Sequence, residues 1–353
     1  MSPQPRILSL ATASPPYTID QDIAAETAAR MFQGKVFRNV DLKAIFANTG
    51  IKTRRTARPL EWYVENQGWP QRNAAYLEAA GDLFVQAAEK AIAASGVAAG
   101  DIGTVVTISS TGVATPSLEA RQHGRLGLSP GVRRVPVFGL GCAGGVSGLA
   151  LAARLALAQP GRPVLLVIVE LCSLSYRPDD FSKASVISAA LFGDGAAAAV
   201  VVADEVQEGR ALHGSMEHLW PDTLKIMGWR VDPNGFGVIL SSKLPDFIIE
   251  KLPALVDDFF ASTGIDRAGV DRFVCHPGGT KVLAAIETSL DVPPGTLDHE
   301  RAVLADHGNM SAPTVFFILE RVLEAGAHPG PLVMSAMGPG FTGTLQALGP
   351  ARG

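Results

Sequence analysis

The sequence predicts an α/β fold made of two duplicated halves, in which sheet packs against sheet with helices between and outside. Three observations lead to this prediction. Short β-rich runs alternate with alanine-rich helical runs along the chain, a pattern typical of layered α/β folds. The 353 residues are about twice the usual length of one domain. The second half also repeats the order of motifs found in the first half.

The elements of the first half follow from local patterns. Thr18 and Gln21 have the spacing of a capping box, which predicts a helix that runs through Met31. Two longer helices are expected from their apolar periodicity, namely Leu77–Ser95, which Gly96 ends, and Ala143–Leu157. Short apolar runs rich in β-branched residues predict the following strands: Ile7–Ala11, Val105–Ser109, Val135–Phe138, Val164–Val169 and Ala196–Val202.

The repeat is carried by three features that occur in the same order in both halves. A glycine, a polar turn and a buried strand form Gly96–Gly112 and again Gly264–Thr280. A turn of small residues then opens an apolar helix, in GLGCAGGVSGLALAARL and in HGNMSAPTVFFILERVL. A strand finally follows a proline-glycine loop, in PGRPVLLVIVE and in HPGPLVMSAMG. We therefore expect the boundary after Ala203, in the charged segment DEVQEGR, which divides the chain into residues 1–203 and 204–353.

Composition and charge narrow the classes of protein. Apolar residues make up 47% of the chain and charged residues 18%, which excludes a disordered protein and suggests that some surface is hidden in a subunit interface. The net charge of −4 gives no basic field for nucleic acid. We expect no membrane span, because no apolar run reaches ~18 residues, and no signal peptide within Met1–Pro16.

The three cysteines of the chain, Cys142, Cys172 and Cys275, include no C-x-x-C pair. An odd number of cysteines without such a pair argues against a disulfide framework and against a zinc site, and it indicates a cytosolic protein. Each thiol must then be judged by its surroundings.

Cys142 stands in Gly139-Leu-Gly-Cys-Ala-Gly-Gly145, between an expected strand and an expected helix. A helix N-terminus offers unpaired N–H groups and the positive end of the dipole, which lower a thiol pKa from about 8.5 to roughly 3.5–7.5. Cys142 is therefore a candidate nucleophile, and a small buried hydrophobic side chain is the alternative. An α/β-hydrolase elbow is excluded, because its frame requires glycine where this chain has Leu140.

Among the seven histidines, His276 is the candidate for catalysis. It ends the expected strand Asp271–Cys275 and precedes Pro277. The C-terminal ends of strands are the places where sites form in α/β sheets. Because side chains alternate along a strand, Cys275 is expected to face the other way, into the core.

Asn309 stands in HGNMSAP, the turn that the repeat pairs with the turn of Cys142. An N-cap residue is one interpretation of this asparagine. The duplication offers another, since a pseudo-twofold axis between the halves would bring the two helix N-termini together. His276 would join them from the neighbouring strand, and Cys142, His276 and Asn309 would form one site.

These motifs together resemble those of the type III polyketide synthases, the chalcone-synthase-like members of the thiolase superfamily. The resemblance rests on GCAGG around Cys142, HPGG at His276, GNMSAP around Asn309, LFGDGAAAAVV at 191–201 and GPGFT at 338–342, and it runs from ILSLATASPP to TLQAL. It implies a thiolase-like αβαβα five-layer sandwich of two duplicated halves. It also implies a homodimer that uses coenzyme A thioesters directly and needs no cofactor.

The resemblance implies a role for each residue of the site. Cys142 would accept the starter acyl group from an acyl-CoA, and His276 would keep Cys142 as a thiolate. His276 and Asn309 would then hold the thioester oxygen of malonyl-CoA while decarboxylation produces an enolate, whose charge two N–H donors stabilise. The enolate carbon would attack the Cys142 thioester, and the cycle would repeat.

Other residues match positions around the substrate cavity of the family. Phe192 in LFGDG matches the gatekeeper phenylalanine, although core packing is the simpler interpretation of this residue alone. Thr115 matches a loop residue that reaches into the cavity of the partner subunit. Lys52, Arg54 and Arg55 resemble the segment that meets the phosphates of coenzyme A, and a solvated turn is the alternative. The cavity is further expected to include Cys172, Ser175, Trp229, Gly338, Pro339 and Ser311.

Departures from the plant enzymes bear on the substrate. Cys172 and Ser175 stand where the plant enzymes carry threonines, Trp229 stands where they carry glycine, and Ala336-Met-Gly-Pro-Gly340 replaces G-F-G-P-G. The segment around Trp229 resembles the bacterial branch that makes alkylresorcinols and alkylpyrones. We therefore expect a medium- or long-chain acyl-CoA starter. Two alternatives stay open, a β-ketoacyl synthase III-like enzyme of fatty acid synthesis that condenses once, and a catalytically silent acyl-CoA-binding protein.

Overall fold

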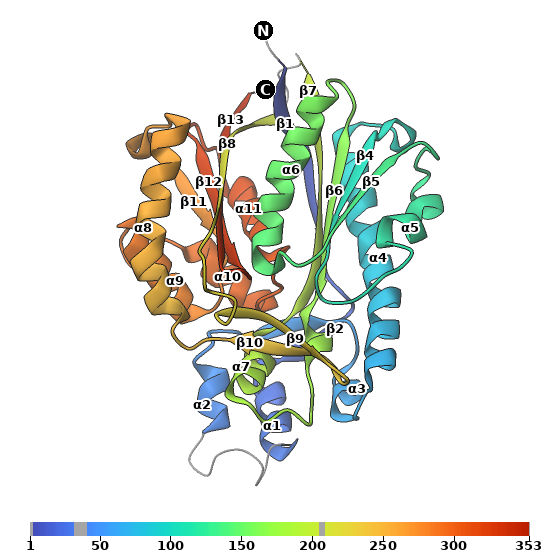
Figure 1. The fold of residues 1–353 in the computed structure, drawn as a ribbon, viewed down its shortest axis with the longest axis vertical. Coiled ribbons are helices and arrows are strands. Elements are labelled where there is room, and N and C mark those ends of the chain that lie inside the picture. The colour runs from blue at the N-terminus through green and yellow to red at the C-terminus, as the bar shows by residue number, and fades with distance from the viewer. Residues whose placement is uncertain (1–2, 32–40, 205–208, 353) are drawn as a thin grey trace.

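The computed structural model describes residues 3–31, 41–204 and 209–352 of the chain (Figure 1). Its main feature is a nine-stranded sheet with the strand order β11-β12-β13-β8-β1-β7-β6-β4-β5. The strands of this sheet are β1 (Gln4–Ala13), β4 (Thr104–Ile108), β5 (Arg133–Val137), β6 (Val164–Leu171), β7 (Asp194–Asp204), β8 (Gly209–Leu219), β11 (Arg272–Cys275), β12 (Leu332–Gly338) and β13 (Thr342–Arg352). The five strands expected in the first half are all present, each with slightly different ends.

The strand order displays the duplication. Outward from β1 come β7, β6 and β4, and outward from β8 come β13, β12 and β11. In each half the outer two of these strands are parallel, and each of the others is antiparallel to its neighbour. Strand β5 extends the first half alone. The two halves are joined where β1 pairs with β8, at Arg6 with Ala211 and Ile7 with Arg210.

The helices form three layers around the two halves of the sheet (Figure 1). Helices α6 (Gly144–Ala158) and α11 (Thr314–Ala325) contact strands of both halves and therefore lie between them. Helices α4 (Trp69–Ser95) and α5 (Leu118–Leu126) cover the outer face of the first half, while α8 (Leu244–Thr263) and α9 (Thr280–Leu290) cover that of the second. The result is the αβαβα five-layer sandwich.

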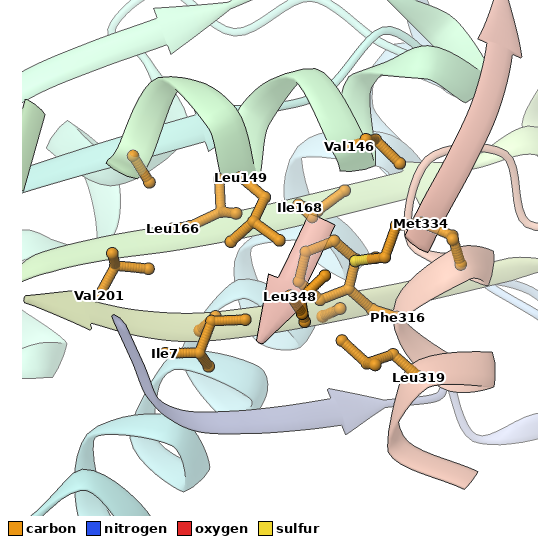
Figure 2. Close-up of a cluster of buried hydrophobic side chains, with 14 of the residues drawn as sticks. Ile7, Val146, Leu149, Leu166, Ile168, Val201, Phe316, Leu319, Met334 and Leu348 are labelled. Carbon is orange, nitrogen blue, oxygen red and sulfur yellow. The ribbon is translucent and has the colours of Figure 1, made fainter. Parts of the chain in front are cut away.

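The strands are apolar on both faces because each half of the sheet is covered on both sides. Along β6, Leu166 and Ile168 belong to the central core around α6 and α11, and Leu165 and Val167 face α4. Figure 2 shows the central core, in which side chains of strands from both halves meet those of α6 and α11. Full burial of one such side chain stabilises the fold by about 1.5–3 kcal/mol, so this core fixes the position of both central helices.

Smaller elements gather at the end of the molecule opposite the two chain termini (Figure 1). They are β2 (Tyr17–Asp20), β3 (Thr53–Thr56), α1 (Gln21–Met31), α2 (Leu42–Ala47), α3 (Leu60–Val64), α7 (Lys183–Leu191), and the hairpin of β9 (Met227–Asp232) and β10 (Gly235–Leu240). Helix α10 (Asp298–His307) leads from this side into α11. These elements surround the site described below.

Two expected helix starts are wrong. Thr18 lies in β2, where it pairs with Arg55 of β3, so it caps no helix. The amide of Gln21 instead donates to the carbonyl of Ala190 at 2.9 Å, which ties α1 to α7. Helix α4 begins eight residues before the expected start, at Trp69. Its end is as expected, because Gly96 takes the left-handed conformation with φ of 70°.

The domain boundary is expected in the segment DEVQEGR after Ala203, of which 205–208 lie outside the described residues. In the described part of the chain, one helical segment, Gly141–Ala158, has the length and mean hydropathy of a membrane span. Two thirds of it (67%) is buried inside the protein, between the two halves of the sheet. The segment is therefore apolar because it forms the central layer of the fold.

Candidate active site

Cys142 lies in a 3₁₀ turn, Gly141–Ala143, directly before α6. The turn needs glycine at two points of close approach. Gly141 has a φ of +49°, and a Cβ there would lie 2.6 Å from Pro339. A Cβ on Gly338 would lie 2.4 Å from the carbonyl oxygen of Leu140. The end of β12 thus presses against the turn and holds Cys142 in place.

His276 follows the last residue of β11, and its backbone N–H donates to Ser335 at 2.9 Å. Its side chain is 4% exposed. Neither ring nitrogen has a hydrogen-bond partner within the described residues. Burial lowers the pKa of His276 to about 4, because the charged form loses its hydration. The imidazole is therefore neutral at pH 7, with both nitrogens available.

Asn309 precedes α11 and is fixed by the backbone around it. Its N–H donates to Leu191 at 2.8 Å, and its carbonyl accepts from Gly193 at 3.0 Å. The side-chain Oδ1 accepts from the N–H of Ser311 at 2.8 Å. The amide nitrogen Nδ2 has only a long contact, 3.5 Å, to the carbonyl of Gly278. The amide is therefore oriented with its N–H donors directed away from Ser311.

The three side chains line one cavity of about 790 Å³. Cys142 comes from the first half of the sandwich, and His276 and Asn309 come from the second. Ser311, which also lines the cavity, donates from Oγ to the Sγ of Cys142 at 3.4 Å. The convergence of the two helix N-termini expected from the duplication thus occurs. The rest of the wall is apolar and consists mainly of Leu191, Phe192, Met227, Trp229, Val238, Ile239, Leu240, Leu244, Ile248, Val282, Met337 and Phe341.

Burial acts against a thiolate at Cys142. Burial raises the pKa of Cys142 to about 11, the Ser311 hydrogen bond opposes this rise, and Glu170 adds to it. The expectation that the helix N-terminus lowers this pKa is wrong for the unliganded site, since desolvation of the thiolate is the larger effect. The cavity thus contains a neutral base, His276, and a protonated thiol, Cys142.

Phe192 and Trp229 lie on the cavity wall as expected. The indole N–H of Trp229 donates to the carbonyl of Ser110 at 2.8 Å, and its ring stacks on Phe236 at 5.7 Å. Phe192 meets Trp229 edge to face at 6.4 Å. The hairpin of β9 and β10 is therefore tied to the loop after β4 through one side chain.

A second cavity of about 610 Å³ adjoins the first. Cys172 and Phe192 line both cavities, so they form the partition between them. Ser175 lines only the second of the two cavities, and its hydroxyl donates to the carbonyl of Cys172 at 2.7 Å. Pro339 lines the first cavity, whereas Gly338 supports it from behind through its contact with the Cys142 turn.

The basic cluster expected to meet coenzyme A does not form as a surface group. Lys52 precedes β3 and is exposed, and within β3 the side chains alternate, so Arg55 remains partly accessible while Arg54 is turned inward. Arg54 is 7% exposed, and it donates to the backbone carbonyls of Ala189 and Phe192. Arg54 is thus excluded from a surface phosphate site. Thr115 is exposed and does not line the cavity of its own chain.

One buried acid near the site was missed by the sequence patterns. Glu170 is the last residue but one of the apolar strand β6 and is fully buried. Its carboxyl accepts from the N–H of Ser110 at 3.0 Å and from the hydroxyl of Thr111 at 2.8 Å. Burial raises the pKa of Glu170 to about 8. The signal that could have found it is the single charge at the end of the run Val164–Leu171.

Within residues 3–31, 41–204 and 209–352, no group of three or more His, Cys, Asp or Glu side chains is arranged to hold a metal ion. The thiol of Cys142, the imidazole of His276 and the amide of Asn309 are the reactive groups that the cavity presents. A thiol that shares a cavity with a neutral base and an oriented N–H donor can form a thioester and stabilise a negative oxygen.

Comparison with known proteins agrees with this arrangement. Residues 3–205 match the family model of the N-terminal domain of chalcone and stilbene synthases, and residues 211–350 match that of their C-terminal domain. The chain is 38% identical to the 1,3,6,8-tetrahydroxynaphthalene synthase of Streptomyces peucetius subsp. caesius, with 97% of this chain and 92% of that one covered. It is 30% identical to the alpha-pyrone synthesis polyketide synthase-like Pks18 of Mycobacterium tuberculosis, with 95% and 88% covered.

Solved structures extend the likeness to the fold. The 1,3,6,8-tetrahydroxynaphthalene synthase from Streptomyces coelicolor A3(2), a bacterial type III polyketide synthase, superposes with a TM-score of 0.93 at 27% identity. The superposition covers 99% of this chain and 100% of that one. PKS-I from the brown alga Ectocarpus siliculosus gives a TM-score of 0.91 at 26% identity, with 99% of each chain covered.

Proposed function

Because this chain belongs to the chalcone and stilbene synthase family of type III polyketide synthases, we propose that it extends an acyl starter on Cys142 by repeated condensation with malonyl-CoA. As a member of this family it is an acyltransferase that takes coenzyme A thioesters and requires no cofactor. The relatives do not favour the single-condensation alternative of fatty acid synthesis. The observation that carries the proposal is the convergence of Cys142, His276 and Asn309 on one cavity.

In the first step the starter is transferred to Cys142. Neutral His276 takes the proton of the thiol, and the new thiolate attacks the acyl carbonyl of the acyl-CoA. The carbon–sulfur bond to coenzyme A breaks, and the leaving thiolate receives the proton from His276. The raised pKa of Cys142 and the lowered pKa of His276 mean that this proton moves during acylation rather than before it.

In the second step malonyl-CoA loses carbon dioxide. The bond between its carboxylate and the central carbon breaks, and the electron pair becomes an enolate on the thioester oxygen. Asn309 donates to this oxygen from Nδ2, since Ser311 occupies Oδ1, and neutral His276 donates from one ring nitrogen. Each such donor is worth about 10²–10³ in rate. The enolate carbon then attacks the Cys142 thioester and expels the thiolate, which lengthens the chain by two carbons.

For the starter we propose a medium- or long-chain fatty acyl group, with cyclisation to an alkylpyrone or alkylresorcinol. The support is the second cavity behind Cys172 and Phe192, whose lining is mostly apolar and therefore suits an alkyl chain. Trp229 forms part of the wall of the first cavity, and the second cavity adds apolar space next to it for an alkyl chain.

We further propose a cytoplasmic homodimer in which Thr115 reaches the partner's cavity. Support comes from the exposure of Thr115, and from two exposed apolar side chains, Val113 at 47% in the segment after β4 and Phe138 at 57% directly after β5. The three free, buried cysteines fit a reducing compartment. Lys52 and Arg55 keep their proposed place near the phosphates of coenzyme A.

The test is product analysis. The enzyme is incubated with malonyl-CoA and acyl-CoA starters from acetyl to stearoyl, and products are identified by mass spectrometry. We expect pyrones or resorcinols that carry the starter chain, with the highest yield for medium or long chains. The Cys142→Ala variant should form no acyl-enzyme, and Asn309→Ala should release carbon dioxide about 10²–10³ more slowly. A single β-ketoacyl product formed with malonyl carrier protein would contradict the proposal.

A further inference from the structure

The hairpin of β9 and β10 forms one wall of the catalytic cavity, to which it contributes Met227, Gly228, Trp229, Val238, Ile239 and Leu240. Among the described strands, β9 and β10 pair only with each other, and no backbone hydrogen bond joins 227–240 to the nine-stranded sheet. A two-stranded hairpin is marginally stable by itself. Side-chain contacts must therefore hold this wall in place.

The turn of the hairpin lies on the first turns of α4 (Figure 1). Gly235 has a φ of +95°, and a Cβ there would lie 2.3 Å from the ring of Trp69. Phe236 meets Trp69 edge to face at 4.8 Å. Arg72, which is 5% exposed, donates from Nη2 to the carbonyl of Asn234. The turns of α4 that the apolar pattern did not predict thus support the hairpin.

A second buried arginine binds the hairpin from the segment before α7. Arg177 is 7% exposed, and its Nη1 donates to both carboxylate oxygens of Asp232 on β9, at 3.0 and 2.9 Å. A Cβ on Gly237 of β10 would lie 3.4 Å from this Nη1, so the guanidinium lies against both strands. Asp232 comes three positions after Trp229, and side chains alternate along a strand. Arg177 therefore holds the hairpin from the face opposite Trp229.

The charges around the turn favour one position of the hairpin. Burial lowers the pKa of Arg72, the nearby charge of Arg177 lowers it further, and Asp179 and Asp232 oppose this fall. Asp179 lies 3.6 Å from Nε of Arg177. If the hairpin moved away, it would take Asp232 with it and leave two neighbouring arginines with too little negative charge. A buried charge that loses its partner is costly, so the hairpin stays where Asp232 meets Arg177.

We propose that Arg72 and Arg177 are positioning residues that hold the hairpin, and Trp229 with it, against the catalytic cavity. Neither arginine lines the cavity, so both act through the wall that they hold. A wall in a single position selects among acyl chains by their length and shape, which is the part of the inference that rests on the proposed function. Cys142, His276 and Asn309 lie on other elements, so loosening the hairpin leaves them in place.

The attachment is tested by hydrogen exchange, which measures local opening, with mass spectrometry on the full-length protein. In Asp232→Asn and in Arg177→Gln, the amides of 227–240 should exchange at least fivefold faster, while β6 and α6 keep the wild-type rates. Asp232→Glu retains the charge and should restore most of the protection. Asp82→Asn removes a carboxylate that pairs with Arg125 at the surface and should leave the hairpin unchanged. Wild-type exchange of 227–240 in both Asp232→Asn and Arg177→Gln would overturn the proposal.

Selection is tested with acyl-CoA starters from acetyl to stearoyl. In Asp232→Asn the ratio of kcat/KM between the best and the poorest starter should fall at least fivefold, and Asp232→Glu should restore it. The rate of malonyl-CoA decarboxylation should stay within twofold of the wild type. An equal loss with every starter and in decarboxylation would reveal a general structural defect and contradict positioning. Faster exchange of the hairpin in a protein whose wild type forms no condensation product would refute the proposed function alone.

Unchanged exchange of the hairpin in a protein that condenses normally would refute this inference alone.

Discussion

At Cys142 two physical effects act on the thiol in opposite directions. A helix N-terminus stabilises an anion by about 0.3–1 kcal/mol. Burial raises the pKa of Cys142 from 9.0 to about 11, and each pKa unit corresponds to about 1.4 kcal/mol. Desolvation is therefore the larger effect, and a base must take the proton of the thiol before it can act as a nucleophile. The position of the cysteine is visible in the sequence, whereas its degree of burial depends on residues from both halves.

This balance predicts the pH dependence of alkylation. The rate at which iodoacetamide labels Cys142, followed by peptide mass spectrometry, should rise about tenfold per pH unit from about pH 6 to about pH 10, because only the thiolate reacts. His276→Gln should leave this profile in place, because the imidazole is neutral throughout the range. A wild-type profile that levels off below about pH 8 would instead reveal a preformed thiolate–imidazolium pair.

Glu170 should make the stability of the folded protein depend on pH. Its pKa is raised from 4.5 to about 8 in the fold, so the folded protein holds a proton that the unfolded chain releases. Stability must then fall as pH rises through this window. The pKa of buried Asp194 is raised to only about 6, so between about pH 6 and about pH 8 the contribution of Glu170 is the larger one.

We expect Glu170→Gln, which is neutral at every pH, to flatten the fall in the free energy of unfolding over the upper part of this window. Urea denaturation at several pH values measures the effect. Glu78→Gln, at an exposed carboxylate, should keep the wild-type slope. An unchanged slope in Glu170→Gln would show that the carboxyl titrates at its ordinary pKa.

At the scale of elements, the two central helices depend on glycine where their N-termini meet. A Cβ on Gly145 of α6 would lie 2.4 Å from the carbonyl oxygen of Ala312, just before α11. The backbone cannot move away without separating the turn of Cys142 from Ser311. The repeat predicts that these helices meet, but only coordinates reveal that one particular glycine sets their distance.

We therefore expect Gly145→Ala to destabilise the protein by about 1–3 kcal/mol, the usual cost of overpacking, and to slow acylation of Cys142. Gly124→Ala in α5 is the matched control, since a Cβ there meets nothing within 4 Å. It should stabilise the protein by about 0.5–1 kcal/mol, as alanine does in a helix interior. Thermal unfolding and single-turnover acylation measure the two effects. Equal stability of the two variants would refute the close contact.

Several elements were predicted less well, for physical reasons. Thr18 and Gln21 have capping-box spacing, but strand pairing of Thr18 with Arg55 provides tertiary contacts that a local motif cannot outweigh. The early start of α4 was signalled by Gly68 and Pro70 at its first turn, yet its first turns lack a clear apolar stripe. Strands β4, β6 and β7 were predicted well because they are apolar on both faces.

At the scale of the whole molecule, the duplication was predictable because matching motifs repeat in order. The joining of the two halves through β1 and β8 was not, since strand pairing over that sequence distance leaves no local pattern. The sheet order leaves β5 at one edge, paired with β4 alone. An edge strand exposes unpaired backbone groups and is usually covered. Two exposed apolar residues follow these strands in the sequence, Val113 in the segment after β4 and Phe138 directly after β5.

The exposure of Val113 and Phe138 predicts a dimer in which Thr115 lines the cavity of the partner subunit. Light scattering should give twice the chain mass of 36.9 kDa, and Phe138→Glu should shift the mass toward the monomer. The location of Thr115 is tested with a hybrid of two differently tagged chains, one carrying Cys142→Ala and the other Thr115→Trp. The only reactive cysteine then lies in the chain with the altered loop.

If Thr115 lines the partner's cavity, that active cavity receives a wild-type threonine from the other chain, and the hybrid makes wild-type products. The Thr115→Trp homodimer should instead make shorter products, because the indole narrows the cavity. A hybrid whose products match those of the Thr115→Trp homodimer would show that the residue acts within its own chain. If light scattering gave the wild-type protein the mass of a single chain, the predicted dimer would be wrong, and one chain would form the complete site by itself.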